Sequence, residues 1–497
     1  MSHADGGHEM HPDAGQAAAA EPPRAPNREL IFQPLTCRNL TLKNRLVRSS
    51  ISGRIDNYDG SGTRARINFE RRFADGGVGA IISSHVPVHV SGRILPNYAT
   101  IDRDERVPFW KAVGEAVHEH DCRYILQLSY SGRQQDIEGV ENWRNDAPLG
   151  EPLTSTDRVD SFHGLRGRRM SEWNHHGKND FEPMVDWFRQ GARRAREAGL
   201  DGIELHSSNG YLFSQFFSSA INDRTDDYGG SLRNRARLFL EVIRAIREEV
   251  GSDFFLMVKL SGQDLDNAIY PWRPEGNGLD DAVLLARWAE DAGVDAIHVS
   301  VGSFFPHPRN PAGPFPFELA SRTYASMIAG GRFTWWNYLL FRYAPWLPRF
   351  LWSRTQQDFL EDGRAAPERV EGLNAAYARA IKQQVRIPVF CTGGFQTAAG
   401  IGRVLREGDC DAVTIARPLL ANPDLPLLLD AGRAPEFPCT YCNKCLVHVL
   451  ENPLGCYDES RYATRGGYPA MIRDIMAIFE DETGTCSTHP PGGGSSA

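Results

Sequence analysis

The sequence lacks the features of several large protein classes. Its formal net charge of −8 is mild and spread along the chain, so no basic face predicts binding to nucleic acid. Nine cysteines among 497 residues are too few for a disulfide scaffold, and no apolar segment follows the N-terminus as it does in a signal peptide. We therefore expect a protein without a nucleic-acid partner, in a reducing and cytoplasmic compartment.

The length leaves room for one large domain with insertions. A hydrophobic content of 41% can build a large core, and a barrel takes about 250 residues. Residues 1–28 have no apolar periodicity, which predicts a disordered tail. Its His3, His8 and His11 are expected to bind a metal ion only weakly. Five scattered cysteines are expected to pack as small hydrophobes or to lie in a tail: Cys37, Cys122, Cys391, Cys410 and Cys486.

Short apolar runs alternate with helical periodicity along the chain. Continuous apolar runs are typical of parallel strands buried on both faces, and they occur at 46–47, 79–82, 124–128, 200–205, 254–260, 296–301, 389–391 and 412–415. Amphipathic helices are expected between them, one with Ser231 as its N-cap and Gly251 as its stop. Eight such strands predict an α/β protein with a (β/α)8 TIM-barrel fold.

The spacing of the runs also predicts the domain boundaries. More than eighty residues separate the sixth run from the seventh, which indicates an insertion at about 303–370. We expect the barrel at 29–436, a cysteine-rich segment at 437–460 and a partly disordered C-terminal extension at 461–497. The polar stretch 135–178 is expected to be a long loop above the active site.

The most informative stretch is 198–235. Its apolar run 200–205 leads directly into His206, Asn209 and Tyr211, and the C-terminal mouth of a parallel strand is where such proteins place their chemistry. A polar loop that only covers the barrel rim is the alternative for a lone histidine.

The whole stretch resembles the Old Yellow Enzyme family of FMN-dependent oxidoreductases. The residues that match the family signature are His206, Asn209, Gly210, Tyr211, Leu212, Gln215, Phe216, Asn222, Arg224, Asp226, Tyr228, Gly229, Gly230, Ser231, Asn234 and Arg235. The resemblance covers roughly residues 31–302 and 371–456. It implies a barrel that binds FMN at its mouth, without a covalent bond because no cysteine follows the first strand.

The resemblance also implies which residues hold the flavin. The segment containing Ser49, Ile51 and Ser52 replaces the family's Ala-Pro-Met-Thr, with Ser50 in place of the proline. His85 stands where relatives contact the flavin through the backbone, so its imidazole has a structural alternative. His206 is expected to contact the flavin as well as the substrate.

Two polar residues lie inside strands. Gln127 sits among apolar neighbours, and a buried amide must find partners; in the family it meets the pyrimidine edge of the flavin. Lys259 is a cation inside an apolar strand and must be paired or face a ligand. Relatives carry Arg or Lys there, against flavin N1 and O2.

The last two strands end in a phosphate-binding pattern. Gly393 and Gly394 follow the seventh strand, and Ala416 and Arg417 follow the eighth. Loops after the last two strands of a barrel commonly bind phosphate through backbone amides, and Arg417 adds a bidentate donor.

Four cysteines cluster just beyond the barrel, at Cys439, Cys442, Cys445 and Cys456. Their spacing suits an iron–sulfur cluster or a zinc site, and unligated thiols are the plainer alternative. The family branch that contains trimethylamine dehydrogenase and 2,4-dienoyl-CoA reductase carries a [4Fe–4S] cluster on a nearly identical motif, which implies the same here. That branch continues into a nucleotide-binding half. This sequence ends without Gly-x-Gly-x-x-Gly, so a separate electron-transfer protein is expected.

Three functions follow as expectations. The first is an ene-reductase that takes electrons from NAD(P)H, with His206 and Asn209 holding the substrate oxygen and Tyr211 donating a proton. The second oxidises an amine or similar substrate and passes electrons through the cluster to an external partner. The third is a flavin-binding subunit without turnover.

The insertion has an unusual composition. Residues 322–354 contain five arginines, no acidic residue and four of the chain's ten tryptophans, namely Trp335, Trp336, Trp346 and Trp352. Apolar segments here are too short and broken to span a bilayer. Aromatic residues interleaved with arginine predict contact with a membrane surface, at the inner face of the membrane. A lid over the active site or a homo-oligomer contact is the alternative.

Overall fold

Eight parallel strands close into a barrel at the centre of the molecule. The computed structural model describes residues 26–95, 97–135, 152–160, 165–173, 177–327 and 334–480. The barrel strands are β3 (Leu46–Arg48), β4 (Ala80–Ile82), β6 (Arg123–Ser129), β9 (Gly202–Ser207), β10 (Phe255–Ser261), β11 (Ala296–Ser300), β14 (Val389–Thr392) and β15 (Ala412–Ile415). Pairing of β15 with β3 and of β4 with β6 closes the ring, and β5 (Val86–Pro87), which follows β4, pairs in parallel with the end of β6. The TIM-barrel prediction is therefore confirmed.

A hairpin seals the amino-terminal end of the barrel. Strands β1 (Leu35–Cys37) and β2 (Leu40–Leu42) pair antiparallel, and their buried residues join a cluster with inward-facing barrel residues such as Phe255 and Met257. Helix α1 (Pro26–Phe32) precedes the hairpin. The chain is therefore helical from Pro26, so the last three residues of the expected tail belong to α1, and residues 1–25 lie outside the described part.

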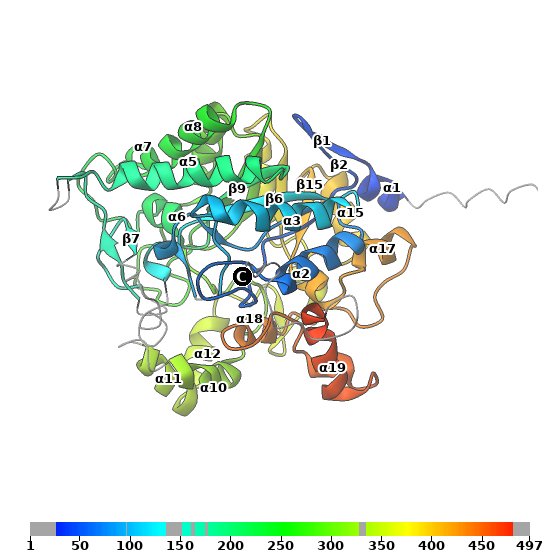
Figure 1. The fold of residues 1–497 in the computed structure, drawn as a ribbon. Coiled ribbons are helices and arrows are strands. Elements are labelled where there is room, and N and C mark those ends of the chain that lie inside the picture. Colours follow the sequence, from blue (N-terminus) through cyan, green and yellow to red (C-terminus); the bar gives the residue numbers. More distant parts are fainter. Residues whose placement is uncertain are drawn as a thin grey trace, which may run out of the picture.

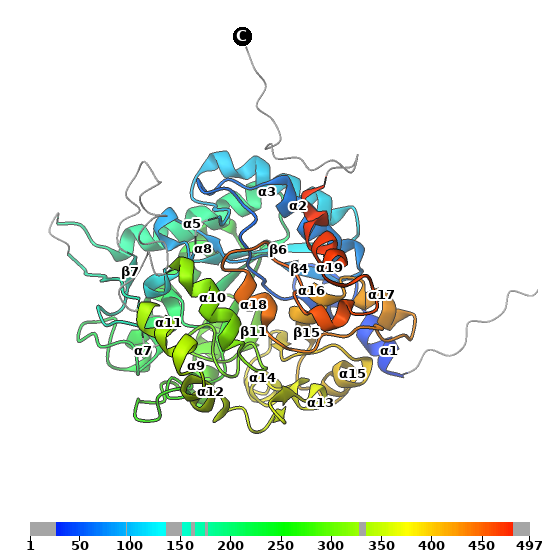
Figure 2. The same ribbon diagram turned by 90° about the horizontal axis from the view of Figure 1, so that it is seen from below.

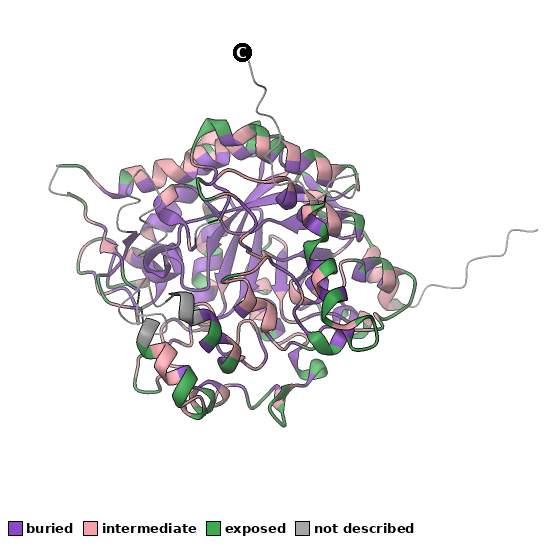
Figure 3. Ribbon diagram, turned by 60° about the horizontal axis from the view of Figure 1, so that its bottom comes forward, coloured by how far each residue is buried: buried purple, intermediate pink, exposed green. Residues whose placement is uncertain are grey.

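Helices surround the barrel and bury their apolar faces against it (Figure 3). They are α2 (Arg64–Asp75), α3 (Val107–His118), α5 (Phe181–Glu197), α7 (Leu232–Arg235), α8 (Arg237–Val250), α9 (Leu279–Asp291), α14 (Ala375–Lys382) and α15 (Ala398–Arg406). Thr63 caps the start of α2. The Ser231 hydroxyl accepts a hydrogen bond from the backbone N–H of Asn234 at the start of α7. Gly251, at φ 69°, ends α8.

The carboxyl ends of the strands are covered by loops, the insertion and the C-terminal segment (Figures 1 and 2). The insertion folds as α10 (Phe317–Met327), α11 (Thr334–Tyr343), α12 (Trp346–Ser353), the short pair β12 (Leu360–Glu361) and β13 (Arg364–Ala365), and α13 (Pro367–Val370). Beyond the barrel come α16 (Arg417–Ala421), α17 (Leu425–Asp430), α18 (Lys444–His448), the 3-10 turn η4 (Glu459–Tyr462), α19 (Gly467–Met476) and η5 (Ala477–Phe479). In Figure 2, α18 lies over the barrel mouth.

The C-terminal extension is partly built into the domain. Asn68 on α2 donates hydrogen bonds to the carbonyls of Ile478 and Glu480, at 2.9 and 3.0 Å. The extension is thus packed on the barrel as far as Glu480, and 481–497 lie outside the described residues.

The insertion has its own core and one exposed aromatic face. Trp352 is buried with Phe315 and Phe317, so the expectation that it reaches a membrane surface is wrong. Trp336 (61%) and Trp346 (68%) stay exposed on α11 and α12, and so do Tyr343 (72%) and Phe350 (64%). The side chain of Trp335 lies outside the described ones.

Two further expectations need correction or restriction. The fourth strand was expected to end at 205, but β9 continues to Ser207, so His206 projects from the strand itself. Of the polar stretch 135–178 the described parts contain β7 (Leu153–Thr154) and β8 (Arg168–Arg169), which pair with each other; 136–151, 161–164 and 174–176 lie outside. In the described part of the chain, none of the helices has the length and apolar character that crossing a membrane requires.

Candidate active site

A large cavity opens at the carboxyl ends of the barrel strands. It comprises about 1590 Å3 including its solvent-open mouth. The expected site residues that line it are Ser49, Ile51, Ser52, His85, His206, Asn209, Tyr211, Lys259, Ala416 and Arg417. The insertion and α18 supply much of the remaining wall, with Phe305, Asn310, Phe315, Ala320 and Val447. The insertion therefore covers the pocket, as the lid interpretation expects.

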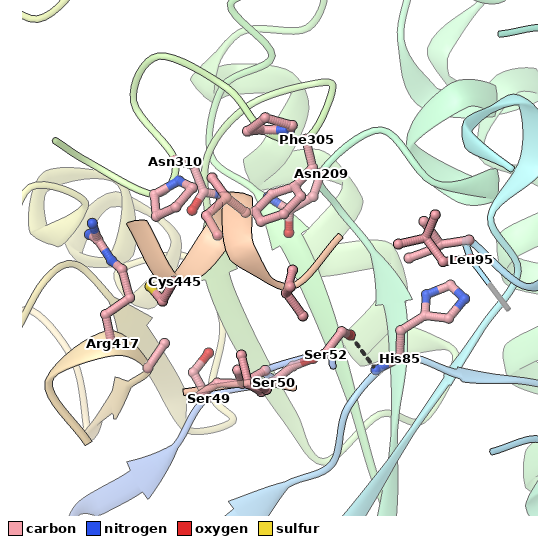
Figure 4. A pocket seen from close by; sticks show the side chains of 18 of the residues that line it. Ser49, Ser50, Ser52, His85, Leu95, Asn209, Phe305, Asn310, Arg417 and Cys445 are labelled. Carbon is pink, nitrogen blue, oxygen red and sulfur yellow. Dashed lines mark hydrogen bonds between the residues drawn. The ribbon is translucent and has the colours of Figure 1, made fainter. Parts of the chain in front are cut away.

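The loop after β3 forms one side of the cavity (Figure 4). The Ser52 hydroxyl accepts a hydrogen bond from the His85 backbone N–H over 3.2 Å. The Ser50 hydroxyl donates to Gln127 Oε1 over 2.8 Å. Ser50, which stands where the family has proline, thus ties this loop to β6.

Gln127 is held inside the barrel. Its Nε2 donates to Glu204 Oε1 over 2.6 Å, and the residue is fully buried and is not among those that line the cavity. The side-chain Nε2 and Oε1 of Gln127 therefore each have one partner already. One N–H proton and one oxygen lone pair are left for a further hydrogen-bond partner. Its expected contact with a flavin edge stays a prediction.

Glu204 joins a buried polar network that the sequence analysis missed. Its Oε2 lies 2.6 Å from His298 Nδ1, and His298 Nε2 lies 2.6 Å from the Thr392 hydroxyl. Burial by itself would raise the pKa of Glu204, but the positive fields of His298 and Lys259 and the hydrogen bonds lower it. Glu204 is therefore an anion below the cavity. The sequence signal that could have indicated this network is the carboxylate of Glu204 within the apolar run 200–205.

Lys259 is the cation of the cavity. It is 6% exposed, and burial lowers its pKa while Glu204 opposes this. Within the described residues its ammonium makes no hydrogen bond and no ion pair, although it faces the cavity. A buried cation without a direct partner is costly, so the position fits an anionic or electron-rich ligand such as the N1 and O2 edge of a flavin.

Three rings gather on another wall of the cavity. His206 and Tyr211 lie 4.5 Å apart between centroids, and His85 lies 5.2 Å from Tyr211. Burial, with the nearby charges, lowers the pKa of His206 well below its ordinary value, and burial lowers the pKa of His85 to about 4. Burial also raises the pKa of Tyr211. Near neutral pH the wall thus presents two neutral imidazoles and a protonated phenol.

Asn209 occupies a left-handed turn, with φ 61°, followed by Gly210 at φ 80°. A Cβ on Gly210 would lie 2.4 Å from the Ser303 carbonyl, so this position requires glycine. The Asn209 amide donates to the Val301 carbonyl over 3.2 Å, and Asn310 donates to the same carbonyl. Asn209 lines the cavity, but its Nδ2 is engaged, so its expected bond to a substrate oxygen stays a prediction. Asn310 is a cavity residue that the sequence did not indicate.

The loops after β14 and β15 meet the cysteine segment. Gly394, at φ 69°, accepts a hydrogen bond from the Tyr441 hydroxyl over 2.5 Å, and neither Gly393 nor Gly394 is among the residues that line the cavity. The Arg417 guanidinium lies over the Tyr441 ring, 5.2 Å from its centroid. The phosphate role of Gly393, Gly394, Ala416 and Arg417 therefore stays a prediction.

A second, smaller cavity of about 300 Å3 lies beside the first. All four clustered cysteines line it, namely Cys439, Cys442, Cys445 and Cys456, and Cys445 and Arg417 line both cavities. No group of three or more His, Cys, Asp or Glu side chains that could hold a metal ion occurs in the described ranges. The metal expectation rests on spacing and on the shared cavity. The scattered Cys37, Cys122, Cys391 and Cys410 are buried, as expected, and Cys486 lies outside the described residues.

Comparison with known protein families gives two matches. The family described as NADH:flavin oxidoreductase / NADH oxidase matches residues 30–322, which contain most of the cavity. The dihydrouridine synthase (Dus) family matches residues 359–484, which contain the last two strands and the cysteine segment.

Individual proteins agree with the first match. The chain is 27% identical over 441 residues to an NADH oxidase of Thermoanaerobacter brockii, covering 86% of this chain and 56% of that protein. It is 32% identical over 311 residues to an NADPH dehydrogenase of Geobacillus sp. (strain WCH70), covering 61% and 82%. A 2-naphthoyl-CoA reductase structure superposes with a TM-score of 0.67 at 22% identity, over 86% and 56% of the two chains, which supports the fold. The chain thus spans about half the length of the first curated relative.

Proposed function

The chain belongs to the NADH:flavin oxidoreductase / NADH oxidase family, and on this basis we propose that it is an FMN-dependent oxidoreductase that reduces an activated alkene with electrons from NAD(P)H. The observation that carries the proposal is the arrangement of one cavity. Lys259 and the loop 49–52 lie on its barrel side, and His206 and Tyr211 stand together on its wall.

FMN, when bound, supplies the hydride that the alkene receives. Lys259 would hold the flavin edge on which negative charge accumulates, because its ammonium faces the cavity and, among the described residues, makes no hydrogen bond and no ion pair. The loop 49–52 and the His85 backbone would hold the flavin face. Residues Gly393, Gly394, Ala416 and Arg417 would hold its phosphate.

His206 and Tyr211 would act on the substrate. A neutral imidazole donates a hydrogen bond to a carbonyl or nitro oxygen and stabilises the negative charge that develops there. The Tyr211 hydroxyl keeps its proton near neutral pH, because its pKa is raised, and it would pass that proton to the carbon beside the carbonyl. Asn209 would join His206 if its amide turned from Val301 to the substrate.

The decisive experiment uses anaerobically purified protein with its bound flavin. Addition of NADH or NADPH should bleach the flavin band, and a cyclic enone such as 2-cyclohexenone should restore it with one enone reduced per flavin. Flavin that is bleached only by an organic amine would support the second function, an amine-type dehydrogenase. Bound flavin that responds to neither would support the non-catalytic subunit.

The cysteine cavity favours a second cofactor. Four cysteines around one cavity that shares Cys445 with the active-site cavity suit a [4Fe–4S] cluster placed to exchange electrons with the flavin. Electrons would then pass to or from a separate electron-transfer protein. The same arrangement supports the second function, in which an amine is oxidised and its electrons pass through the cluster to an external partner.

The exposed face of the insertion suits the surface of an anionic membrane. Trp346 and Phe350 are four residues apart and share one side of α12, and the exposed Tyr343 ends α11 just before it. Arg342 and Arg349 are exposed beside them. Aromatic rings sit at headgroup level while arginines meet anionic lipid. Because the same insertion walls the cavity, a lipophilic substrate would enter from the membrane. A homo-oligomer contact through this face is the competing outcome.

A further inference from the structure

Arg461 is a buried arginine that lines the cysteine cavity. It is 3% exposed and belongs to the turn η4. Its Nη1 lies 3.1 Å from Cys456 Sγ, in hydrogen-bond geometry with Arg461 as the donor. Cys456 is one of the four cysteines that line this cavity, and Arg461 lines it too.

The other hydrogen bonds of Arg461 fix it to the barrel. Nε donates to the Phe437 carbonyl over 3.0 Å, and Nη2 donates to the Ala421 carbonyl over 2.7 Å and to Asn422 Oδ1 over 3.0 Å. Ala421 ends α16, which follows the last barrel strand. The guanidinium is therefore held in one orientation by Nε and Nη2, which leaves Nη1 for the contact with sulfur.

None of these acceptors carries a formal charge if Cys456 is a thiol. Among the described residues Arg461 has no carboxylate within 4 Å, although Asp458 is nearby in sequence. The Asp458 oxygens are instead bonded to Thr440, at 2.5 Å, and to Ser460, at 2.7 Å. A buried guanidinium without an anion is strongly unfavourable. A negatively charged sulfur centre in the cavity would remove this imbalance.

We infer that Arg461 is a positioning residue that compensates the negative charge of an iron–sulfur centre at Cys456 and raises its reduction potential. The inference rests on the cluster proposed above. A cluster ligated by four thiolates is anionic, and its one-electron reduction adds a further negative charge. A fixed cation that donates a hydrogen bond to a ligand sulfur stabilises the reduced state more than the oxidised state. Arg461 would thereby favour electron transfer into the cluster.

Three variants of the full-length protein separate this role from a structural one. Arg461→Gln removes the charge and shortens the side chain, and Arg461→Lys keeps the charge but loses the planar fork. Arg465→Gln is the matched control. Arg465 lies one turn further on, is exposed, and stacks on the neighbouring Tyr462 ring at 5.0 Å. Its contacts with described side chains are with Asp474, Phe437 and Tyr462.

The measurement is a dye-mediated redox titration of anaerobically purified protein, followed by electron paramagnetic resonance, with iron and FMN contents determined on the same samples. The midpoint potential should shift to more negative values in Arg461→Gln, shift less in Arg461→Lys and stay at the wild-type value in Arg465→Gln. Equal potentials in wild type and Arg461→Gln would overturn the inference.

Loss of iron from Arg461→Gln would also be informative. If Arg461→Lys then retains iron, positive charge is the requirement and the inference stands. If both variants lose iron equally, Arg461 acts only through its geometry and the charge role is rejected. Wild-type protein that contains FMN but no iron would refute the cluster itself. The iron content of wild-type protein is measured first, so this outcome is known before any variant is made.

Discussion

The Arg417 guanidinium donates a hydrogen bond to Asn443 Oδ1 over 2.5 Å and so joins the end of the last barrel strand to the cysteine segment. Asn443 in turn donates to the carbonyls of Pro311 and Pro314 in the insertion, both at 3.2 Å. Three parts of the chain that are distant in sequence therefore meet at Arg417, which lines both cavities. These hydrogen bonds fix the position of the cysteine segment relative to the cavity at the barrel mouth.

Replacement of Tyr211 by phenylalanine tests proton donation. The variant should keep flavin reduction by NAD(P)H and lose about 10²–10⁴-fold in the rate of enone reduction, which is the usual value of general-acid catalysis. Stopped-flow measurement of the two half-reactions separates these effects. An enone rate equal to that of wild type would remove Tyr211 from the mechanism.

Replacement of His206 by alanine tests the substrate-binding wall. Phenols, which mimic an enolate, should bind more weakly and perturb the flavin spectrum less. Because the pKa of His206 lies well below its ordinary value, the neutral imidazole dominates throughout the pH range of about 5–8, where an unperturbed histidine titrates. Phenol affinity of the wild type should therefore be flat over this range and fall only at lower pH. A titration centred near the ordinary histidine pKa would contradict the assignment.

Replacement of Lys259 by methionine tests the cation below the flavin. Loss of a hydrogen bond to a charged group costs about 1.5–3 kcal/mol, which corresponds to roughly 10–100-fold weaker FMN binding. Lys259→Arg retains the charge and is the control. Release of FMN can be followed by its fluorescence, and unchanged affinity in the methionine variant would mean that Lys259 serves Glu204 alone.

Replacement of Cys442 by serine tests the cysteine cavity. We expect about four iron and four sulfide per chain in wild-type protein and their loss from the variant, with FMN retained because most of its expected ligands line the other cavity. Cys122→Ser is a suitable control, since Cys122 is buried far from the cluster motif in sequence. Zinc in place of iron after anaerobic preparation would indicate a structural metal site.

Replacement of Tyr343, Trp346 and Phe350 by serine tests the aromatic face of the insertion. Wild-type protein should sediment with vesicles of phosphatidylcholine and phosphatidylglycerol, less so at high salt, and the triple variant should remain in the supernatant. Trp272→Ser is the control, because Trp272 is 74% exposed outside the insertion. Wild-type protein that never sediments, but forms a dimer that the triple variant does not, would assign this face to an oligomer contact.

The sequence alone determined the barrel and indicated which residues to expect at its mouth. Each strand was a largely apolar run, because a strand covered on both faces has no polar side, and Ser231 and Gly251 were recognisable as the start of α7 and the end of α8. A charged residue in such a run is conspicuous, which is why Lys259 was found. The dense motif around His206 and Tyr211 then indicated the family.

Only the tertiary structure decided which partners the polar residues have. Gln127 is held by Ser50 and Glu204, and Asn209 by Val301, because strands and loops that are far apart in sequence meet inside the barrel. The aromatic residues of the insertion show the same limit. Composition cannot separate Trp352, which is buried, from Trp346, which is exposed, since the difference lies in how α12 packs on α10 and on the loop before it. Arg461 likewise became informative only when folding placed it against Cys456.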